Sequence, residues 1–315
     1  MPARSTANRS SLKAMDDGGE PTRALDNARR LIQAGAVALT AFHGTRSIEA
    51  LRPLLEQTGV PLVGAASSAD SLREPPLRHL FNLRAGARDE VAAIVSHLDT
   101  IALNRIAAIA QDDGLGASGL EGLKVELVRL AMRPVASEGL TAGASPDAVE
   151  AALRRVCSAA PQAVLLALDA RLALEVLRSA AKSGCLNTQF VAFSETGAAL
   201  SMSDRAAEAR GLTVSQVLPH PTQISHALVA AYQRALGTQP SAASYPSLEG
   251  YLYGRVLGHV LRACGKRPTS ACIVDRLENA PPAIEGWRLR FARDDRTGSR
   301  YVNLTLLGAA GKVSR

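Results

Sequence analysis

The chain has 315 residues, of which 47% are hydrophobic and 21% charged, a composition typical of a globular protein. Its net charge of +7 comes mainly from arginines that are scattered rather than gathered into a basic stripe, which argues against a nucleic-acid partner. No apolar run is long enough to span a membrane, and no signal peptide is visible at the start. The length exceeds one ordinary core, so we expect two lobes.

Short apolar runs alternate with stretches of helical periodicity along the whole chain. We predict strands at residues 12–15, 36–41, 60–63, 79–83 and 105–110, separated by helices near 24–32, 47–58 and 91–98. The pattern then restarts, with helices near 117–130, 147–157 and 171–183 and strands from 134 and at 163–168, 189–193 and 212–217. Helices at 225–236 and 248–262 and strands at 287–291 and 301–307 close the chain. Such alternation is typical of doubly wound sheets and predicts two α/β lobes.

A candidate binding site follows the strand at 36–41, where Thr45 and Ser47 open a helix. A helix N-terminus at the carboxyl end of a parallel strand can hold a carboxylate or a phosphate. Ser67 and Ser68 follow the next strand, so neighbouring strands would bring these hydroxyls to one crevice with Thr45. The same residue types also cap helices, and the sequence leaves both interpretations open.

Two pairs of acidic residues, Asp16-Asp17 and Asp112-Asp113, also lie at strand ends. Clustered carboxylates at such a place can hold Mg²⁺, which gives a magnesium-dependent hydrolase or phosphotransfer domain as the alternative function. Aspartate is equally common in turns before glycine and in helix caps. The second interpretation needs no ligand and is the simpler one.

Other catalytic signatures are weak. Gly114-x-Gly116-x-x-Gly119 matches a dinucleotide motif, but no acidic residue ends a following strand at the expected distance. His43 has no evident partner, and no nucleophile–base pair is visible. We therefore predict a protein that is not an enzyme and that has no metal and no cofactor.

The four cysteines show no CxxC pair and no metal-ligand spacing with the six histidines. We interpret Cys157, Cys185, Cys264 and Cys272 as small buried thiols. A disulfide between Cys264 and Cys272 stays open, since it requires the intervening loop to fold back.

Several stretches, in this order and spacing, resemble type I periplasmic binding proteins of the leucine/isoleucine/valine-binding branch. They are Asp16-Asp17-Gly18, Pro21-Thr22-Arg23-Ala24, Asn27-Ala28-Arg29-Arg30-Leu31-Ile32, Gly44-Thr45, Gly59-Val60-Pro61, Phe81-Asn82-Leu83-Arg84-Ala85, Gln111-Asp112-Asp113-Gly114-Leu115-Gly116 and Ser247-Leu248-Glu249-Gly250-Tyr251. The resemblance implies two lobes joined by three crossovers, 1–111 with 221–292 and 112–220 with 293–315. It also implies a non-catalytic protein that binds a small solute between the lobes and delivers it to the membrane subunits of an ABC importer.

The resemblance also places the ligand. In the family, hydroxyls and N–H groups of the first lobe hold the ligand's carboxylate, and the matching positions here are Thr45, Ala66 and Ser68. These positions agree with the crevice inferred from the strand ends. We therefore expect a solute with a carboxylate, such as an amino acid or a related organic acid.

The second lobe departs from the family pattern. Leu115 stands where a tyrosine is usual, and a further aromatic position falls near Asp169. The acid that pairs with the ligand's amino group falls near Ser194 or Glu195. The carboxylate half of the site is thus kept better than the amino half. A ligand sensor in the cytoplasm is a further alternative.

Family members begin with an export signal and a strand–turn–helix unit, whereas only 11 residues precede Leu12 here. In the family, that first strand lies between the strands matched by 12–15 and 36–41. The resemblance therefore implies a shortened form with an incomplete first lobe. The family is periplasmic, but the chain as written would stay in the cytoplasm.

Overall fold

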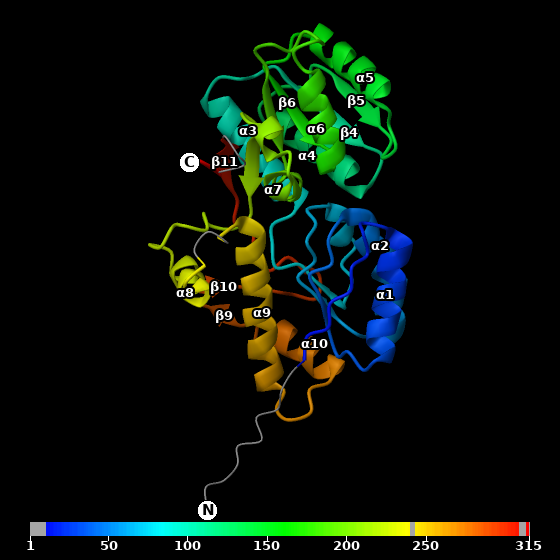
Figure 1. Cartoon of the computed structure of the whole chain (residues 1–315), viewed down its shortest axis with the longest axis vertical. Coiled ribbons are helices and arrows are strands. Elements are labelled where there is room, and N and C mark those ends of the chain that lie inside the picture. Colours follow the sequence, from blue (N-terminus) through cyan, green and yellow to red (C-terminus); the bar gives the residue numbers. More distant parts are fainter. Residues whose placement is uncertain (1–10, 240–242, 309–312, 315) are drawn as a thin grey trace, which may run out of the picture.

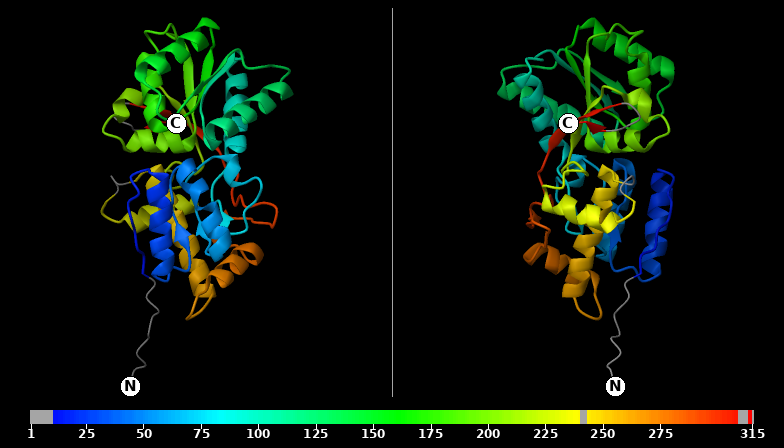
Figure 2. Two further views of the ribbon diagram at one scale, coloured as in Figure 1. Left: turned by 90° about the vertical axis from the view of Figure 1, so that its right-hand side faces the viewer. Right: turned by 60° about the vertical axis from the view of Figure 1, so that its left-hand side comes forward.

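The computed structural model describes residues 11–239, 243–308 and 313–314. The chain forms two lobes stacked along its longest axis, as Figures 1 and 2 show. Both lobes are α/β, which confirms the fold class predicted from the alternating pattern. Among the described residues, no helix is both long and apolar enough to cross a bilayer.

The lower lobe in Figure 1 contains a small parallel sheet in the order β1-β2-β3 and an antiparallel pair, β9 and β10. Its first part comprises α1 (Pro21–Gln33), β1 (Leu39–Thr40), α2 (Thr45–Thr58), β2 (Leu62–Val63), the 3-10 turn η1 (Asp70–Leu72) and β3 (Leu80–Phe81). Its second part comprises α8 (Ala227–Leu236), α9 (Tyr245–Ala263), α10 (Ser270–Asn279), β9 (Ala283–Ile284) and β10 (Trp287–Arg288). Segments far apart in sequence therefore build this lobe together.

The upper lobe is built on a seven-stranded sheet in the order β12-β11-β8-β7-β6-β4-β5. Its strands are β4 (Ile106–Gln111), β5 (Ser137–Leu140), β6 (Ala163–Ala167), β7 (Gln189–Ala192), β8 (Thr213–Gln216), β11 (Asn303–Leu307) and β12 (Val313–Ser314). Its helices are α3 (Ala87–Thr100), α4 (Gly114–Arg129), α5 (Pro146–Ser158), α6 (Ala170–Ser179), α7 (Ser194–Met202) and the 3-10 turn η2 (Ala206–Ala209). β4 to β8 are parallel, whereas β11 is antiparallel to β8 and to the edge strand β12.

The core of the upper lobe follows from the apolar strands β4 and β6, in which every residue is buried. Successive side chains of a strand point to opposite faces of the sheet. Ala108 and Leu165 accordingly belong to the cluster that contains residues of α3 and α4, whereas Ile109 and Leu166 belong to the cluster with α5 and α6. Both faces are covered by helices, which explains why these strands are apolar throughout.

The glycines at 114, 116 and 119 lie in α4 and serve close packing. A Cβ atom on Gly116 would lie 1.8 Å from the carbonyl oxygen of Gln111, and one on Gly119 would lie 2.6 Å from Cβ of Ala167. The helix can therefore approach the sheet only because these side chains are absent. Packing accounts for this motif without a dinucleotide.

The expected lobe boundary at residue 111 places one strand and one helix in the wrong lobe. β4 is a central strand of the seven-stranded sheet, and α3 packs against α4, β8 and β11. Residues 87–111 therefore belong with the upper lobe, and the first crossover follows β3. The error arises because the sequence of an apolar strand does not indicate which of the two sheets contains it.

The predicted strand at 12–15 is wrong. Residues 11–17 belong to no strand, and Leu12 is 84% exposed. They form one wall of a groove of about 780 Å³, and residues 34–43 form the facing wall. Leu31, Leu257 and Leu261 contribute apolar side chains to the same groove.

The cysteines form two disulfides, Cys157–Cys185 and Cys264–Cys272. The interpretation as free buried thiols is wrong, and the disulfide left open for Cys264 and Cys272 is confirmed. The first bond ties the end of α5 to the loop after α6. The two cysteines are 28 residues apart, and the fold of the sheet brings their segments together, so no local sequence pattern indicated this pair.

Candidate functional site

The lower lobe contributes hydroxyls from two neighbouring strand ends. Gly44, at a φ of +84°, turns the chain into α2, and the helix begins at Thr45 without a side-chain cap. The Thr45 hydroxyl lies 2.8 Å from the Ser67 hydroxyl, and both side chains are buried. Thr45 and Ser47 are thus inside the helix, and their interpretation as N-caps is wrong.

The next two predicted residues are already engaged within the chain. The backbone N–H of Ala66 donates to the carbonyl of Phe42 at 2.8 Å. The backbone N–H of Ser68 donates to Oε2 of Glu195 at 2.6 Å, and the Ser68 hydroxyl donates to Oε1 of Glu90 at 2.5 Å. The structure therefore brings Ser68 of the lower lobe together with Glu195 of the upper lobe.

Glu195 is a buried carboxylate in the first turn of α7. In Figure 1, α7 lies on the side of the upper lobe that faces the lower lobe. Burial raises the pKa of Glu195 to about 7, because a charged carboxylate is poorly stabilised away from water. The nearby Arg84 guanidinium and the N–H of Ser68 lower that pKa in part, as does the Ser67 hydroxyl. Glu195 thus titrates near neutral pH.

Glu90 is a residue that sequence reasoning missed. It lies in α3, is fully buried, and its Oε2 accepts hydrogen bonds from the N–H of Ser194 at 2.8 Å and the hydroxyl of Ser215 at 2.5 Å. Its Oε1 accepts from Ser68 and lies 3.9 Å from the guanidinium of Arg84. One carboxylate therefore connects α7, β8 and the strand end after β2.

Arg84 is the second missed residue and pairs with Glu249 of α9 at 3.3 Å. It also donates to the hydroxyls of Ser194 and Ser68. Burial alone would lower the pKa of Arg84, but the Glu249 and Glu90 carboxylates raise it overall, so the guanidinium stays charged. Its sequence signals were its place at the end of the strand at 79–83 and its inclusion in the stretch Phe81-Asn82-Leu83-Arg84-Ala85 of the resemblance. Neither signal showed that it is buried, since burial of an arginine depends on partners distant in sequence.

Tyr253 completes the polar cluster from the lower lobe. Its hydroxyl donates to Oε1 of Glu249 at 2.6 Å, and burial followed by that carboxylate raises the pKa of Tyr253 well above its usual value. The ring packs directly over Gly64, where a Cβ atom would lie 2.7 Å from two ring carbons. The tyrosine therefore stays a neutral donor that orients Glu249.

The remaining predicted residues of the second lobe have structural partners. Leu115 is buried in the core cluster that also contains Leu72 of the lower lobe. Asp169 caps α6 by accepting from the N–H of Leu172 at 2.8 Å, while its own N–H donates to Gln111 at 3.1 Å. Neither contact tests a role in binding, which stays a prediction.

The acidic pairs behave as turn and cap residues. Asp16 accepts from the N–H of Gly18 and Asp17 from that of Gly19, and Asp113 caps α4 through the N–H of Gly116. Within the described ranges, no group of three or more histidine, cysteine, aspartate or glutamate side chains is placed to hold a metal ion. The geometry therefore gives the magnesium-dependent alternative no support.

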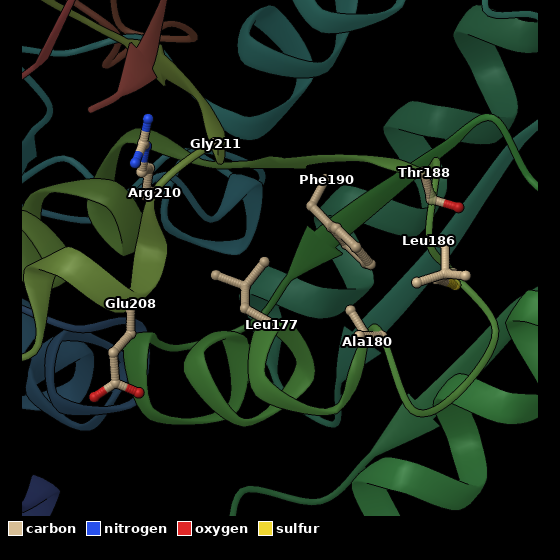
Figure 3. A pocket seen from close by; sticks show the side chains of 10 residues that line it. Leu177, Ala180, Leu186, Thr188, Phe190, Glu208, Arg210 and Gly211 are labelled. Atoms are coloured by element: carbon tan, nitrogen blue, oxygen red, sulfur yellow. The ribbon is translucent and has the colours of Figure 1, made fainter. Parts of the chain in front are cut away.

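A second hollow, of about 330 Å³, lies in the upper lobe and is shown in Figure 3. Leu177, Phe190, Glu208 and Arg210 line it, and Glu208 is already paired with Arg178 at 2.5 Å. None of the predicted site residues contributes to it. The polar cluster between the lobes remains the candidate site.

Comparison with known proteins places the whole chain. Residues 11–312 match the family described as periplasmic binding protein. A possible leucine/isoleucine/valine-binding protein from Rhodopirellula baltica SH 1 is similar in structure, with a TM-score of 0.82 and 26% identity over 96% of this chain and 84% of that one. An extracellular ligand-binding receptor from Verminephrobacter eiseniae EF01-2 is also similar, with a TM-score of 0.81 and 23% identity over 97% of this chain and 88% of that one.

A branched-chain amino acid ABC transporter protein from Thermus thermophilus, with bound valine, gives a TM-score of 0.77 and 16% identity, over 95% of this chain and 82% of that chain. At that identity the likeness shows the fold alone. No curated protein matches the sequence significantly. With its match over residues 11–312 and its two α/β lobes, the chain belongs to the periplasmic binding protein family and has the type I fold.

Proposed function

We propose that this protein binds a small carboxylate-bearing solute, an amino acid or a related organic acid, between its lobes and delivers it to the membrane subunits of an ABC importer. The observation that carries the proposal is the Ser68 N–H, which already holds a carboxylate, that of Glu195, at 2.6 Å. The hydroxyls of Thr45 and Ser67 belong to the same lobe as Ser68 and are buried. A solute's carboxylate would use the same donors.

Two further features support the proposal. The family consists of solute-binding proteins without catalytic activity, and the described residues hold no arrangement for metal chemistry. The disulfides Cys157–Cys185 and Cys264–Cys272 suit an oxidising compartment such as the periplasm, because cytosolic thiols are kept reduced. This favours a role outside the cytoplasm over a cytoplasmic sensor.

Calorimetry with a panel of amino acids and organic acids tests the proposal. Thr45→Ala and Ser68→Ala should each weaken binding by about 1–3 kcal/mol, because each removes a hydroxyl from a buried polar site. Thr58→Ala is the matched control, since Thr58 lies at the exposed end of the same helix and donates only to Leu54. Absence of binding across the panel, or equal affinity in all three variants, contradicts the proposal.

A further inference from the structure

Arg73 is a buried cation whose hydrogen bonds within the described residues all end on backbone carbonyls. It follows the turn η1 and is 6% exposed. Nη1 donates to the carbonyl of Ala69 at 2.8 Å, and Nη2 donates to that of Ser67 at 3.2 Å. Nη2 also donates to the carbonyls of Ala85 at 3.1 Å and Arg84 at 3.3 Å. Because a guanidinium is planar and rigid, these contacts fix the positions of the segments that supply the carbonyls.

The four carbonyls belong to two segments with different tasks. One pair belongs to the site loop, residues 67–69, which supplies a hydroxyl and the Ser68 N–H to the candidate site. The other pair belongs to the first crossover, residues 84–86 between β3 and α3. The two segments also meet directly, since the N–H of Ala87 donates to the carbonyl of Ser68 at 2.6 Å. Arg73 therefore joins the loop that carries the donors to the segment that connects the lobes.

Gly86 leaves the space that Arg73 occupies beside the crossover. A Cβ atom on Gly86 would lie 2.8 Å from Nε and 2.9 Å from Cδ of Arg73, and 2.6 Å from Oδ1 of Asp70. The φ of Gly86 is −94°, which any residue adopts without strain. The glycine is therefore needed for its close approach to Arg73 and not for its backbone conformation.

The charge of Arg73 is not needed to fill its place. Burial lowers the pKa of Arg73 to about 10, and the Asp70 carboxylate opposes this effect while the nearby Arg84 adds to it. The guanidinium is still charged at neutral pH, so its burial is unfavourable. An apolar side chain of similar length would fill the same space without that disadvantage. The guanidinium is explained by its donors rather than by packing.

We propose that Arg73 is a positioning residue of the binding site, which holds the site loop against the first crossover and so places the Ser68 N–H and the Ser67 hydroxyl where they donate to a carboxylate. That this carboxylate is a solute's rests on the proposed function, whereas the positioning does not. In the chain itself both donors act on Glu195. The Ser68 N–H lies 2.6 Å from its carboxylate, and both donors lower the pKa of Glu195. That pKa therefore reports where the two donors lie.

The test replaces Arg73 by a side chain with the same charge and fewer donors. Arg73→Lys ends in a compact ammonium that cannot span carbonyls on both segments. We expect the pKa of Glu195 to rise by about one pH unit, because weakening one hydrogen bond to a charged group has about this effect. Gly86→Ala should raise it too, since the new Cβ displaces an unaltered Arg73. Titration of the carboxyl carbon resonance by NMR, assigned with Glu195→Gln, measures the pKa in each variant.

Arg52→Lys is the matched control. Arg52 of α2 donates to the carbonyl of Ser71 at 2.7 Å, outside the site loop, so this variant should leave the pKa of Glu195 unchanged. An unchanged pKa of Glu195 in Gly86→Ala or in folded Arg73→Lys, even with a lower free energy of unfolding, would show that Arg73 only stabilises the fold and would overturn the proposal. An equal rise in Arg52→Lys would also overturn it. If Arg73→Lys does not fold, Gly86→Ala decides alone. The measurement needs no solute, so the calorimetric panel decides the proposed function separately.

Discussion

The N–H of Ser68 in the lower lobe donates a hydrogen bond of 2.6 Å to the carboxylate of Glu195 in the upper lobe. Closing the lobes therefore removes a carboxylate from water, and this is the physical cause of the raised pKa of Glu195. Because Ser68 also donates its hydroxyl to Glu90, one residue of the lower lobe connects two buried acids of the upper lobe. The first two predictions concern these two acids.

The stability of the protein should fall as the pH rises through the range in which Glu195 loses its proton. The pKa of Glu195 rises from 4.5 to about 7 on folding, so the folded state binds the proton more tightly. The contribution of Glu195 to the free energy of unfolding is therefore greatest below pH 4.5, decreases up to about pH 7 and then levels off. At about 1.4 kcal/mol per pH unit, the loss due to this one group is about 3 kcal/mol.

Glu195→Gln replaces the ionisable carboxyl by a neutral amide, so the pH dependence of the unfolding free energy that Glu195 causes should disappear. Denaturant titrations of both proteins between pH 4 and 8 give the difference in unfolding free energy directly. We expect that difference to grow with pH and to become constant above about pH 7, where wild-type Glu195 is charged. A difference that does not change with pH would contradict the assignment.

Glu90→Ala should be strongly destabilising. The substitution leaves Arg84 with fewer counter-charges and removes the acceptor for the Ser194 N–H and the hydroxyls of Ser68 and Ser215. Loss of one partner from such a buried network costs about 3–5 kcal/mol. Urea unfolding measures the change.

The matched control is Arg88→Ala, two residues before Glu90 on the same helix. Arg88 pairs with Glu74, but its side chain is 55% exposed and that of Glu74 is 64% exposed. An exposed ion pair contributes about 0–1 kcal/mol. If both variants lose similar amounts of stability, the buried network contributes less than its geometry indicates.

Gly64→Ala should destabilise the lower lobe and loosen the site. Gly64 has a φ of +80°, which an alanine adopts with strain, and its Cβ would collide with the Tyr253 ring at 2.7 Å. Strain and overpacking together should cost about 2–4 kcal/mol, measured by thermal or urea unfolding. Displacement of Tyr253 would also remove its hydrogen bond to Glu249.

Gly250→Ala provides the control on α9, the helix that carries Tyr253. A Cβ atom at Gly250 would meet nothing within 4 Å, and its φ is not positive. Alanine is the better helix former, so this variant should gain up to about 1 kcal/mol. Opposite signs for the two substitutions are therefore expected. A loss at Gly250 as well would show that the cost at Gly64 is not specific to its contact with Tyr253.

The helices α1 to α6 and the strands β4, β6, β7, β8 and β11 were predictable because their apolar periodicity is local. β5 begins at Ser137 rather than at 134, and α10 and β12 were not predicted. The meeting of the Thr45 and Ser67 hydroxyls was likewise predictable, since hydroxyls at consecutive strand ends meet at one edge of a parallel sheet. Binding of a ligand by Thr45, Ser67 and Ser68 stays a prediction. The assignment of Glu195 came from the family resemblance. Its contact with Ser68 lay beyond the sequence, because it depends on how far the lobes close.

Glu90 and Arg84 could not be found, because nothing in the local pattern marks a charged residue as buried. Glu90 lies in the first turn of α3, where an acid is usual at the surface. Only the packing of α3 against β8 and the strand end at Ser68 removes it from water. The short helix α7 was also missed, since its nine residues have no clear apolar stripe.

The last prediction concerns the outer edge of the small sheet. β1 pairs with β2 through Leu39 and Ala41, so the N–H and C=O of Thr40 point away from β2. That edge faces the groove of about 780 Å³ whose opposite wall is the segment 11–17. Within the described chain, no backbone hydrogen bond holds residues 12–15. The wall formed by residues 11–17 therefore depends on few backbone contacts, whereas the β1 wall is held to β2 by the N–H groups of Leu39 and Ala41.

Protection of amides from hydrogen exchange should therefore follow the boundary between the two sheets rather than change at residue 111. We expect amides of 12–15 and Thr40 to exchange with opening free energies near zero, because nothing is broken when they meet water. Amides of β4 and β6, where every residue is buried between two ladders, should approach the free energy of global unfolding. Mass spectrometry of peptides from 11–20, 36–44 and 104–112 measures all three regions in one experiment. Protection of the first two peptides equal to that of the third would show that the groove is closed in solution.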